Sequence, residues 1–166
     1  MGGDIKCLET GKRKNLAMTP KEIVLGGYQC FSEGDLESLG KNFHEKALIK
    51  VSGNHKRSGE FRGFEDWRDN FLSHLPTDYP NFDLQILDVV AEGDRVHVYV
   101  KYTADNLDAN GVHMFLVEDG LETEFIIFDD TPKMAAALGN LMRQWIFPNI
   151  PSYPIPSSTM PSKFRV

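Results

Sequence analysis

One histidine stands where an isolated polar side chain among apolar neighbours could do chemistry. His113 alternates with Phe115 and Val117, so in an extended segment the three side chains share one face. An apolar wall lowers the pKa of an imidazole and keeps the ring neutral. A neutral imidazole can abstract a proton or donate a hydrogen bond to a carbonyl oxygen. The alternative is a buried histidine that bonds a neighbouring side chain, and the sequence leaves both open.

Two polar residues on predicted helices are further candidates. Tyr28 either borders a cavity or is a core tyrosine whose hydroxyl reaches the rim. Asn70 lies in a predicted helix with Trp67 and Phe71, and an amide that faces an apolar cavity needs a hydrogen-bonding partner. Asn70 therefore either meets a ligand or lies on the solvent side of its helix.

Other titratable residues are expected to lie away from any site. Glu122 and Glu124 are predicted on the face opposite Phe125, which argues against a pair of catalytic carboxylates. No spacing typical of a metal site, such as His-Glu-x-x-His, is present, and we expect neither a metal nor a cofactor. Three histidines are expected to be solvated, namely His44, His55 and His74.

The elements that must position these residues begin with helices. A capping box of Thr19 and Glu22 starts a predicted helix that ends at Gly34. A second helix is predicted from Asp35 to Phe43, and a third begins at Gly63. A short strand over 48–51 and a polar loop over 52–62 separate the second helix from the third.

Strands follow with short connections. Alternating apolar residues predict strands over 82–91, 95–103, 112–117 and 122–129, with a loop over 104–110 and a turn at Asp119-Gly120. Helices followed by hairpin-connected strands predict an α+β fold with an antiparallel sheet. A twisted sheet that curls around a few helices encloses a space in which ligands commonly bind.

The two ends of the chain differ from its middle. Residues 1–18 include a short basic run and are expected to be a flexible leader, and the domain is predicted over 19–130. A last helix is predicted over 131–147. Many of the nine prolines follow within 148–166, and because proline lacks a backbone donor this segment is predicted to be a tail or an extended arm.

Composition narrows the partners and the compartment. The 166 residues include 18 Lys+Arg and 24 Asp+Glu, a net charge of −6, which argues against a nucleic-acid partner. No apolar run approaches the ~20 residues that cross a bilayer, so no membrane partner is expected. The first residues lack a secretory pattern. Cys7 and Cys30 are too few for a disulfide framework, and a cytoplasmic location is expected.

The order of these elements resembles the nuclear transport factor 2-like superfamily. Phe31 to Leu36 is similar to its helix, Gly-Asp-Leu, helix opening; Gly63 to Trp67 resembles its third helix; Phe115 to Glu124 resembles its final hairpin. The nearest branch is identified as the SnoaL-like polyketide cyclase and ketosteroid isomerase group. The resemblance implies a cone-shaped, cystatin-like fold with a curved antiparallel sheet around three N-terminal helices. It also implies an apolar pocket and homodimers formed through the outer face of the sheet.

The same resemblance bears on the candidate site. Ketosteroid isomerases have a catalytic tyrosine at the position of Gly27, so Tyr28 is displaced from it by one residue. They have a base where Val51 stands and an acid where His113 stands, and SnoaL-like cyclases have an acid where Ile127 stands. Two of the usual carboxylates are thus replaced by aliphatic side chains, which leaves His113 as the candidate catalytic residue.

Three functions are consistent with these residues. One is a cofactor-independent acid/base enzyme, of cyclase, isomerase or dehydratase type, that acts on an apolar carbonyl or ring compound. The second is a non-catalytic protein that binds a small apolar molecule in the same pocket. The third is a dimeric assembly module whose own side chains fill the pocket. The predicted ligand-binding residues are Tyr28, Phe31, Trp67, Asn70, Phe71, Phe115, Phe125 and Ile127.

Overall fold

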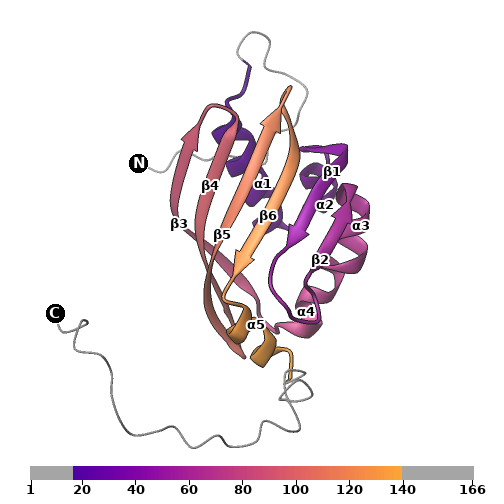
Figure 1. Cartoon of the computed structure of the whole chain (residues 1–166), viewed down its shortest axis with the longest axis vertical. Helices are drawn as coiled ribbons and strands as arrows, with labels where there is room; N and C mark the ends of the chain where they lie inside the picture. Colours follow the sequence, from indigo (N-terminus) through magenta and orange to yellow (C-terminus); the bar gives the residue numbers. More distant parts are fainter. Residues whose placement is uncertain (1–16, 140–166) are drawn as a thin grey trace, which may run out of the picture.

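The computed structural model describes residues 17–139. A six-stranded sheet of order β2-β1-β6-β5-β4-β3 curves around the N-terminal helices, which confirms the α+β prediction (Figure 1). The helical segments are α1 (Pro20–Glu33), α2 (Leu36–Gly40), α3 (Gly63–Asn70), the 3-10 turn η1 (Leu72–His74), α4 (Leu75–Asp78) and α5 (Thr131–Ala137). The strands are β1 (Phe43–Val51), β2 (Gly59–Arg62), β3 (Asp83–Glu92), β4 (Arg95–Ala104), β5 (Leu107–Glu118) and β6 (Leu121–Asp129).

The predicted start and end of the first helix are confirmed. The Glu22 amide donates to the Thr19 hydroxyl oxygen over 3.3 Å, and the Thr19 amide donates to the Glu22 carboxylate over 2.8 Å. Gly34 ends α1 in the left-handed region at φ 74°, and Asp35 caps α2. These local signals fix the two ends of α1, whose buried residues include Ile23, Val24 and Cys30.

Three segments contain more strand than the sequence predicts. The second helix ends at Gly40, and Phe43 belongs to β1, where it pairs with Glu122 of β6. Its ring packs against Phe64 and Trp67. The polar segment after β1 contains the edge strand β2, which pairs antiparallel with β1. The predicted loop over 104–110 contains the start of β5, which pairs with β4 as far as Leu107.

The sheet is antiparallel except where its two halves join. Strands β3, β4, β5 and β6 form an antiparallel series, and the predicted turn between β5 and β6 is confirmed with φ 51° at Asp119 and 80° at Gly120. β1 runs parallel to β6. This junction places β6 in the middle of the sheet, so its inward side chains face the helices.

A bulge in β6 changes which of its side chains face inward. The pairing with β5 shifts by one residue at Thr123. The buried positions of β6 are therefore Glu122, Phe125 and Ile127, with a spacing of three and then two. Glu122 thus shares the face of Phe125, and the prediction that it lies on the opposite face was wrong.

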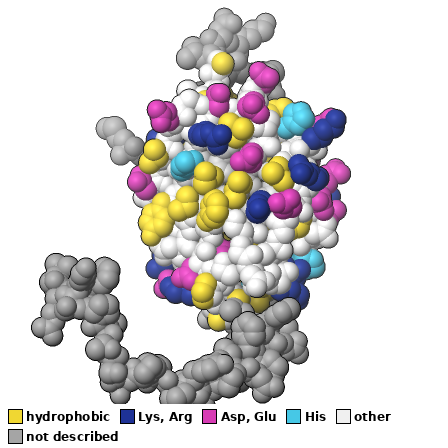
Figure 2. Space-filling model, viewed as in Figure 1, with side chains coloured by type: hydrophobic (Ala, Val, Ile, Leu, Met, Phe, Trp, Pro, Cys, Tyr) yellow, Lys and Arg dark blue, Asp and Glu magenta, His cyan; other side chains and the backbone are white. Residues whose placement is uncertain are grey.

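The outer face of the sheet carries exposed apolar side chains. Tyr99 of β4 pairs with Val112 of β5, which pairs in turn with Phe128 of β6, so the three lie side by side across the strands. Their exposed fractions are 43%, 36% and 45%. We call these three residues the outer stripe; hydrophobic side chains gather over the middle of the molecule in Figure 2.

The last helix is only partly described. Asp130 caps α5, and Met134 and Ala135 bury its inner side. The remainder of the predicted C-terminal helix, the proline-rich segment and most of the predicted leader lie outside the described residues. No helix within 17–139 is long and apolar enough to cross a membrane.

Candidate functional site

A cavity lies between the concave face of the sheet and the helices. Its volume is about 70 Å³, counted over positions open to the centre of a water molecule. One water needs ~10–15 Å³ on that measure, so the interior is hollow and suits a compact ligand. Every predicted ligand-binding residue except Asn70 lines this cavity, as does His113.

Aromatic rings form the floor and one wall of the cavity. Phe115 and Phe125 lie opposite each other on β5 and β6, and their rings stack at 4.3 Å with an interplanar angle of 7°. Trp67 of α3 meets Phe125 edge to face at 5.4 Å and stacks on Phe71 at 5.9 Å. The result is a cluster of aromatic rings that gives this side of the cavity an apolar surface for a ring-shaped ligand.

His113 lies between two tyrosines that come from different elements. The hydroxyl of Tyr28, on α1, is 2.5 Å from Nδ1 of His113, and the hydroxyl of Tyr102, on β4, is 2.6 Å from Nε2. Burial lowers the pKa of His113 to about 3, so its ring is neutral at physiological pH. Burial also raises the pKa of both tyrosines, which keep their protons. We call these three residues the Tyr–His–Tyr trio.

The proton count of the trio leaves one donor free. A neutral imidazole has one N–H donor and one acceptor nitrogen. One tyrosine therefore donates its proton to the acceptor nitrogen, while the other accepts the ring N–H and keeps its own O–H for another partner. Since Tyr28 and Tyr102 both line the cavity, this spare hydroxyl can serve a ligand oxygen there.

Gly111 makes room for the trio. A Cβ at position 111 would lie 2.5 Å from the Tyr102 hydroxyl oxygen and 2.7 Å from the carbonyl oxygen of Phe128. Only a residue without a side chain allows Tyr102 to reach His113 along this line. Sequence reasoning did not assign Tyr102 to the site, although its alternation with the buried valines of β4 places it on the inner face.

Glu122 is a second feature that the sequence did not indicate. Its side chain lines the cavity and is 1% exposed, and its Oε2 atom has no hydrogen-bond partner. Burial raises its pKa well above the ordinary value, which favours the neutral acid. Strict alternation hides this residue, because only the bulge at Thr123 turns it inward.

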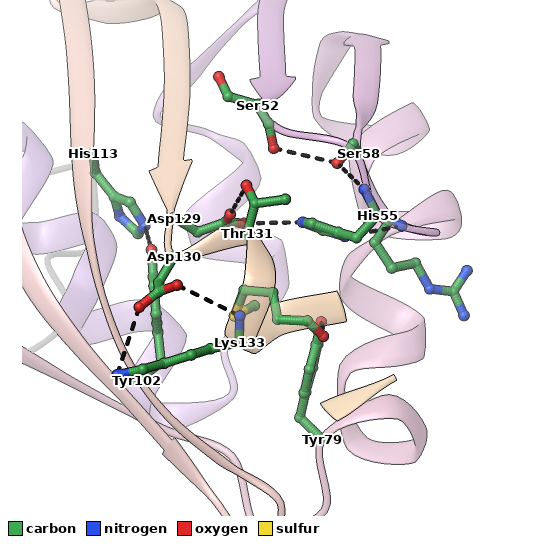
Figure 3. A network of polar contacts seen from close by, with 12 residues as sticks. Ser52, His55, Ser58, Tyr79, Tyr102, His113, Asp129, Asp130, Thr131 and Lys133 are labelled. Carbon is green, nitrogen blue, oxygen red and sulfur yellow. Dashed lines mark hydrogen bonds and ion pairs between the residues drawn. The ribbon is translucent and has the colours of Figure 1, made fainter. Parts of the chain in front are cut away.

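A second carboxyl group lies where the cavity meets a buried polar network (Figure 3). Asp129 accepts from the Thr131 hydroxyl over 2.9 Å, and its Oδ2 atom is 3.0 Å from Nε2 of His55. Nδ1 of His55 accepts the Arg57 amide over 3.2 Å, so the ring proton is on Nε2 and is donated to Asp129. The side chains of His55 and Asp129 are each 1% exposed. The prediction that His55 is solvated was therefore wrong.

Asn70 does not contribute to the cavity. Its side chain is exposed, and its amide nitrogen donates to the backbone oxygen of Asp66 over 3.1 Å and to a carboxylate oxygen of Asp66 over 2.8 Å. Trp67 and Phe71 are the residues of this segment that face inward. Placing Asn70 among the ligand-binding residues was wrong, because it lies on the solvent side of α3.

Other reactive groups are scarce in the described part of the chain. Cys30 is buried in the core at 4% exposure, and residues 17–139 contain no free cysteine. Over the same residues, no group of three or more His, Cys, Asp or Glu side chains is arranged to hold a metal ion.

Comparison with known proteins gives a family model and structural neighbours. The model of the SnoaL-like domain matches residues 24–125. No curated protein matches the chain.

Three solved structures illustrate the shared fold. A nuclear transport factor 2-like protein from Burkholderia thailandensis is 19% identical and has a TM-score of 0.68, covering 73% of this chain and 98% of its own. TerC, co-crystallised with polyporic acid, is 23% identical with a TM-score of 0.64, covering 72% and 98%. A protein with a cystatin-like fold from Xanthomonas campestris is 24% identical with a TM-score of 0.64, covering 74% and 99%. At these identities the likeness concerns the fold.

Proposed function

The chain belongs to the SnoaL-like domain family of the nuclear transport factor 2-like superfamily, and from this premise we propose that its cavity binds a small apolar carbonyl or ring compound and transforms it by cofactor-independent acid/base chemistry. The observation that carries the proposal is the Tyr–His–Tyr trio on the wall of a largely apolar cavity. A preorganised donor in a dry site stabilises charge that develops on a carbonyl oxygen more strongly than water does. The crystallisation of TerC with polyporic acid supports a ligand-binding use of this fold.

In this proposal the trio acts as one unit. Both ring nitrogens of His113 face tyrosine hydroxyls, so the histidine orients them and passes a proton between them. The spare tyrosine hydroxyl donates to the carbonyl oxygen. Asp129 lines the cavity, and its side chain is held by His55 and Thr131. We assign it the role of the base that accepts the proton from the carbon beside the carbonyl.

Exchange of protons beside a carbonyl tests this function. Acetophenone is incubated with the protein in heavy water, and loss of its methyl proton signal is followed by NMR. We expect wild type to accelerate the exchange, and the Tyr28→Phe/Tyr102→Phe double variant to lose about a hundredfold of that acceleration. An unaccelerated exchange would contradict acid/base catalysis.

Non-catalytic binding of the same ligand class is the second candidate. It is favoured by Val51 and Ile127, which are 2% and 6% exposed and stand where relatives are expected to carry carboxylates. Acetophenone that binds without accelerated exchange would support this candidate. The hollow interior disfavours the third, an assembly module with a filled pocket.

We also propose that a second copy of the chain covers the outer stripe. Tyr99, Val112 and Phe128 form a continuous apolar row across three strands, whereas apolar residues on a monomer's surface are usually scattered singly. An isologous contact would pack this row against itself.

A further inference from the structure

The carboxyl group of Glu122 is buried, and the fold leaves one of its two oxygens without a hydrogen-bond partner. Its side chain is 1% exposed, and Oε2 has no hydrogen-bond partner. Among the described buried side-chain atoms, only the Trp67 indole nitrogen shares this condition, and Trp67 lines the same cavity. Buried polar atoms are nearly always paired, so two exceptions beside one cavity call for an explanation by function.

The space beside this carboxyl is kept open by Gly27. A Cβ at position 27 would lie 3.7 Å from Oε1 of Glu122 and 3.3 Å from Nδ2 of Asn42. A side chain larger than a methyl group at this position would therefore occupy the volume next to the carboxyl. With glycine there, both Gly27 and Glu122 border the cavity.

Glu122 and His113 lie at different places along the cavity floor. Glu122 pairs with Val117 on β5, which is four residues beyond His113. Four residues span ~13 Å along a strand. The stacked rings of Phe115 and Phe125 occupy the interval between them, so the floor carries a polar group at each end of an apolar middle.

We infer that Glu122 is a second anchor for the ligand, a neutral carboxylic acid that exchanges hydrogen bonds with a hydroxyl or carbonyl group remote from the Tyr–His–Tyr trio. The inference rests on the proposed function, in which the trio holds the first oxygen. Burial and the missing partner both favour the neutral acid, which has one donor and one acceptor to offer. The ligand is then a compact ring compound with two oxygen functions.

Two probes that differ by one hydroxyl group test this inference. Acetophenone has one oxygen, and 4-hydroxyacetophenone has a second at the far side of the ring. Affinities are measured by calorimetry for wild type, Glu122→Leu, Glu122→Gln and the control Glu124→Gln on the same strand. We expect wild type and the control to bind the hydroxylated probe about tenfold more tightly, as one added hydrogen bond allows.

The variants at position 122 decide what the carboxyl group does. Glu122→Leu is expected to lose the preference for the hydroxylated probe, and Glu122→Gln to keep part of it, while acetophenone binds all four proteins alike. Without ligand, Glu122→Leu is expected to unfold at the same Tm as wild type or higher, because it removes an unpaired buried group.

Three results would overturn the inference. One is a wild type that binds both probes equally or binds neither, and another is a preference that survives Glu122→Leu. The third is a Tm of Glu122→Leu clearly below that of wild type, which would make the carboxyl a support of the fold. If wild type binds acetophenone and this binding is lost in the Tyr28→Phe/Tyr102→Phe variant, the proposed function stands even where the inference about Glu122 fails. If wild type binds neither probe, both fail.

Discussion

Four of the titratable side chains that line this cavity are uncharged. His113 is neutral because burial lowers its pKa to about 3, and Glu122 is neutral because burial raises its pKa. Neutral groups offer a donor and an acceptor without the cost of a buried charge. The hydroxyls of Tyr28 and Tyr102 keep their protons for the same reason. The part of the cavity beside these four residues therefore suits the hydrogen-bonding of a neutral carbonyl compound.

The pH dependence of stability reports on His113. Its pKa is about 3 in the folded state against 6.5 for a free imidazole, so the unfolded chain takes up a proton first as the pH falls. The stability that the neutral ring contributes is fully present above pH 6.5 and is lost as the pH falls toward 3. We expect His113→Gln to flatten this part of the profile, measured by urea unfolding across the range. A variant that keeps the wild-type slope would contradict a buried neutral histidine.

The contribution of Glu122 to the free energy of unfolding changes with pH in the opposite direction. Its pKa is raised in the folded state above the ordinary value of 4.5, so the unfolded chain releases its proton first as the pH rises. The stability contributed by the protonated carboxyl is full below pH 4.5 and declines as the pH rises toward the folded-state pKa. In the same unfolding series, Glu122→Gln should lose less stability with rising pH than wild type. Parallel profiles would indicate an exposed or paired carboxyl instead.

Sequence reasoning reached only some of these residues. His113 was a candidate because it shares a strand face with apolar neighbours and stands at a family acid position, and Tyr28 because it lies one residue from a family tyrosine position. The structure places both on the cavity. Glu122 was missed because alternation along a strand does not reveal the bulge at Thr123. His55 was missed because the polar composition of its segment does not reveal the buried contact with Asp129. Asn70 was misassigned, because its closeness in sequence to Trp67 and Phe71 does not determine whether its own side chain faces the cavity or the solvent.

At the scale of elements, two devices shape the site. The bulge at Thr123 turns Glu122 inward. Gly111 leaves room for the Tyr102 side chain to lie against β5 and reach His113. Helix caps and the Asp119-Gly120 turn were predictable because their signals are local. The bulge, the edge strand β2 and the parallel contact of β1 with β6 were not, since each depends on a strand distant in sequence.

Two glycine substitutions distinguish a glycine that is required for side-chain packing from one that only lowers the stability of its helix. Gly111→Ala would put a methyl group 2.5 Å from the Tyr102 hydroxyl oxygen, and overpacking of this kind destabilises by ~1–3 kcal/mol. Gly26→Ala, in α1, meets nothing within 4 Å and should stabilise the helix by ~0.5–1 kcal/mol. Denaturant unfolding of both variants measures the difference. Equal effects would show that Tyr102 is not held against Gly111.

The whole molecule presents two apolar surfaces with different uses. The concave face of the sheet is closed by α1 to α3 and keeps a hollow, whereas the convex face exposes the outer stripe. The fold class followed from the order of helices and strands. Which apolar positions enclose a cavity, and which remain exposed, followed only from the pairing of the strands.

The outer stripe predicts the oligomeric state. If a second copy covers it, Val112→Glu at its centre should convert a dimer to a monomer by placing like charges opposite each other. Lys21→Glu, on an exposed position of α1, is the control and should leave the dimer intact. Light scattering coupled to size-exclusion chromatography gives the masses. A monomeric wild type, or a Val112→Glu dimer, would remove the stripe from any self-association.

In the proposed function, the Tyr–His–Tyr trio donates a hydrogen bond to a carbonyl oxygen inside the cavity. The infrared carbonyl band of isotope-labelled acetophenone bound to the protein measures this donation directly. We expect the carbonyl band of the ligand bound to wild type to lie below its position in water. For the Tyr28→Phe/Tyr102→Phe variant we expect the band to return toward its position in an apolar solvent. A band that is the same in both proteins, or no protein-bound band, would contradict it.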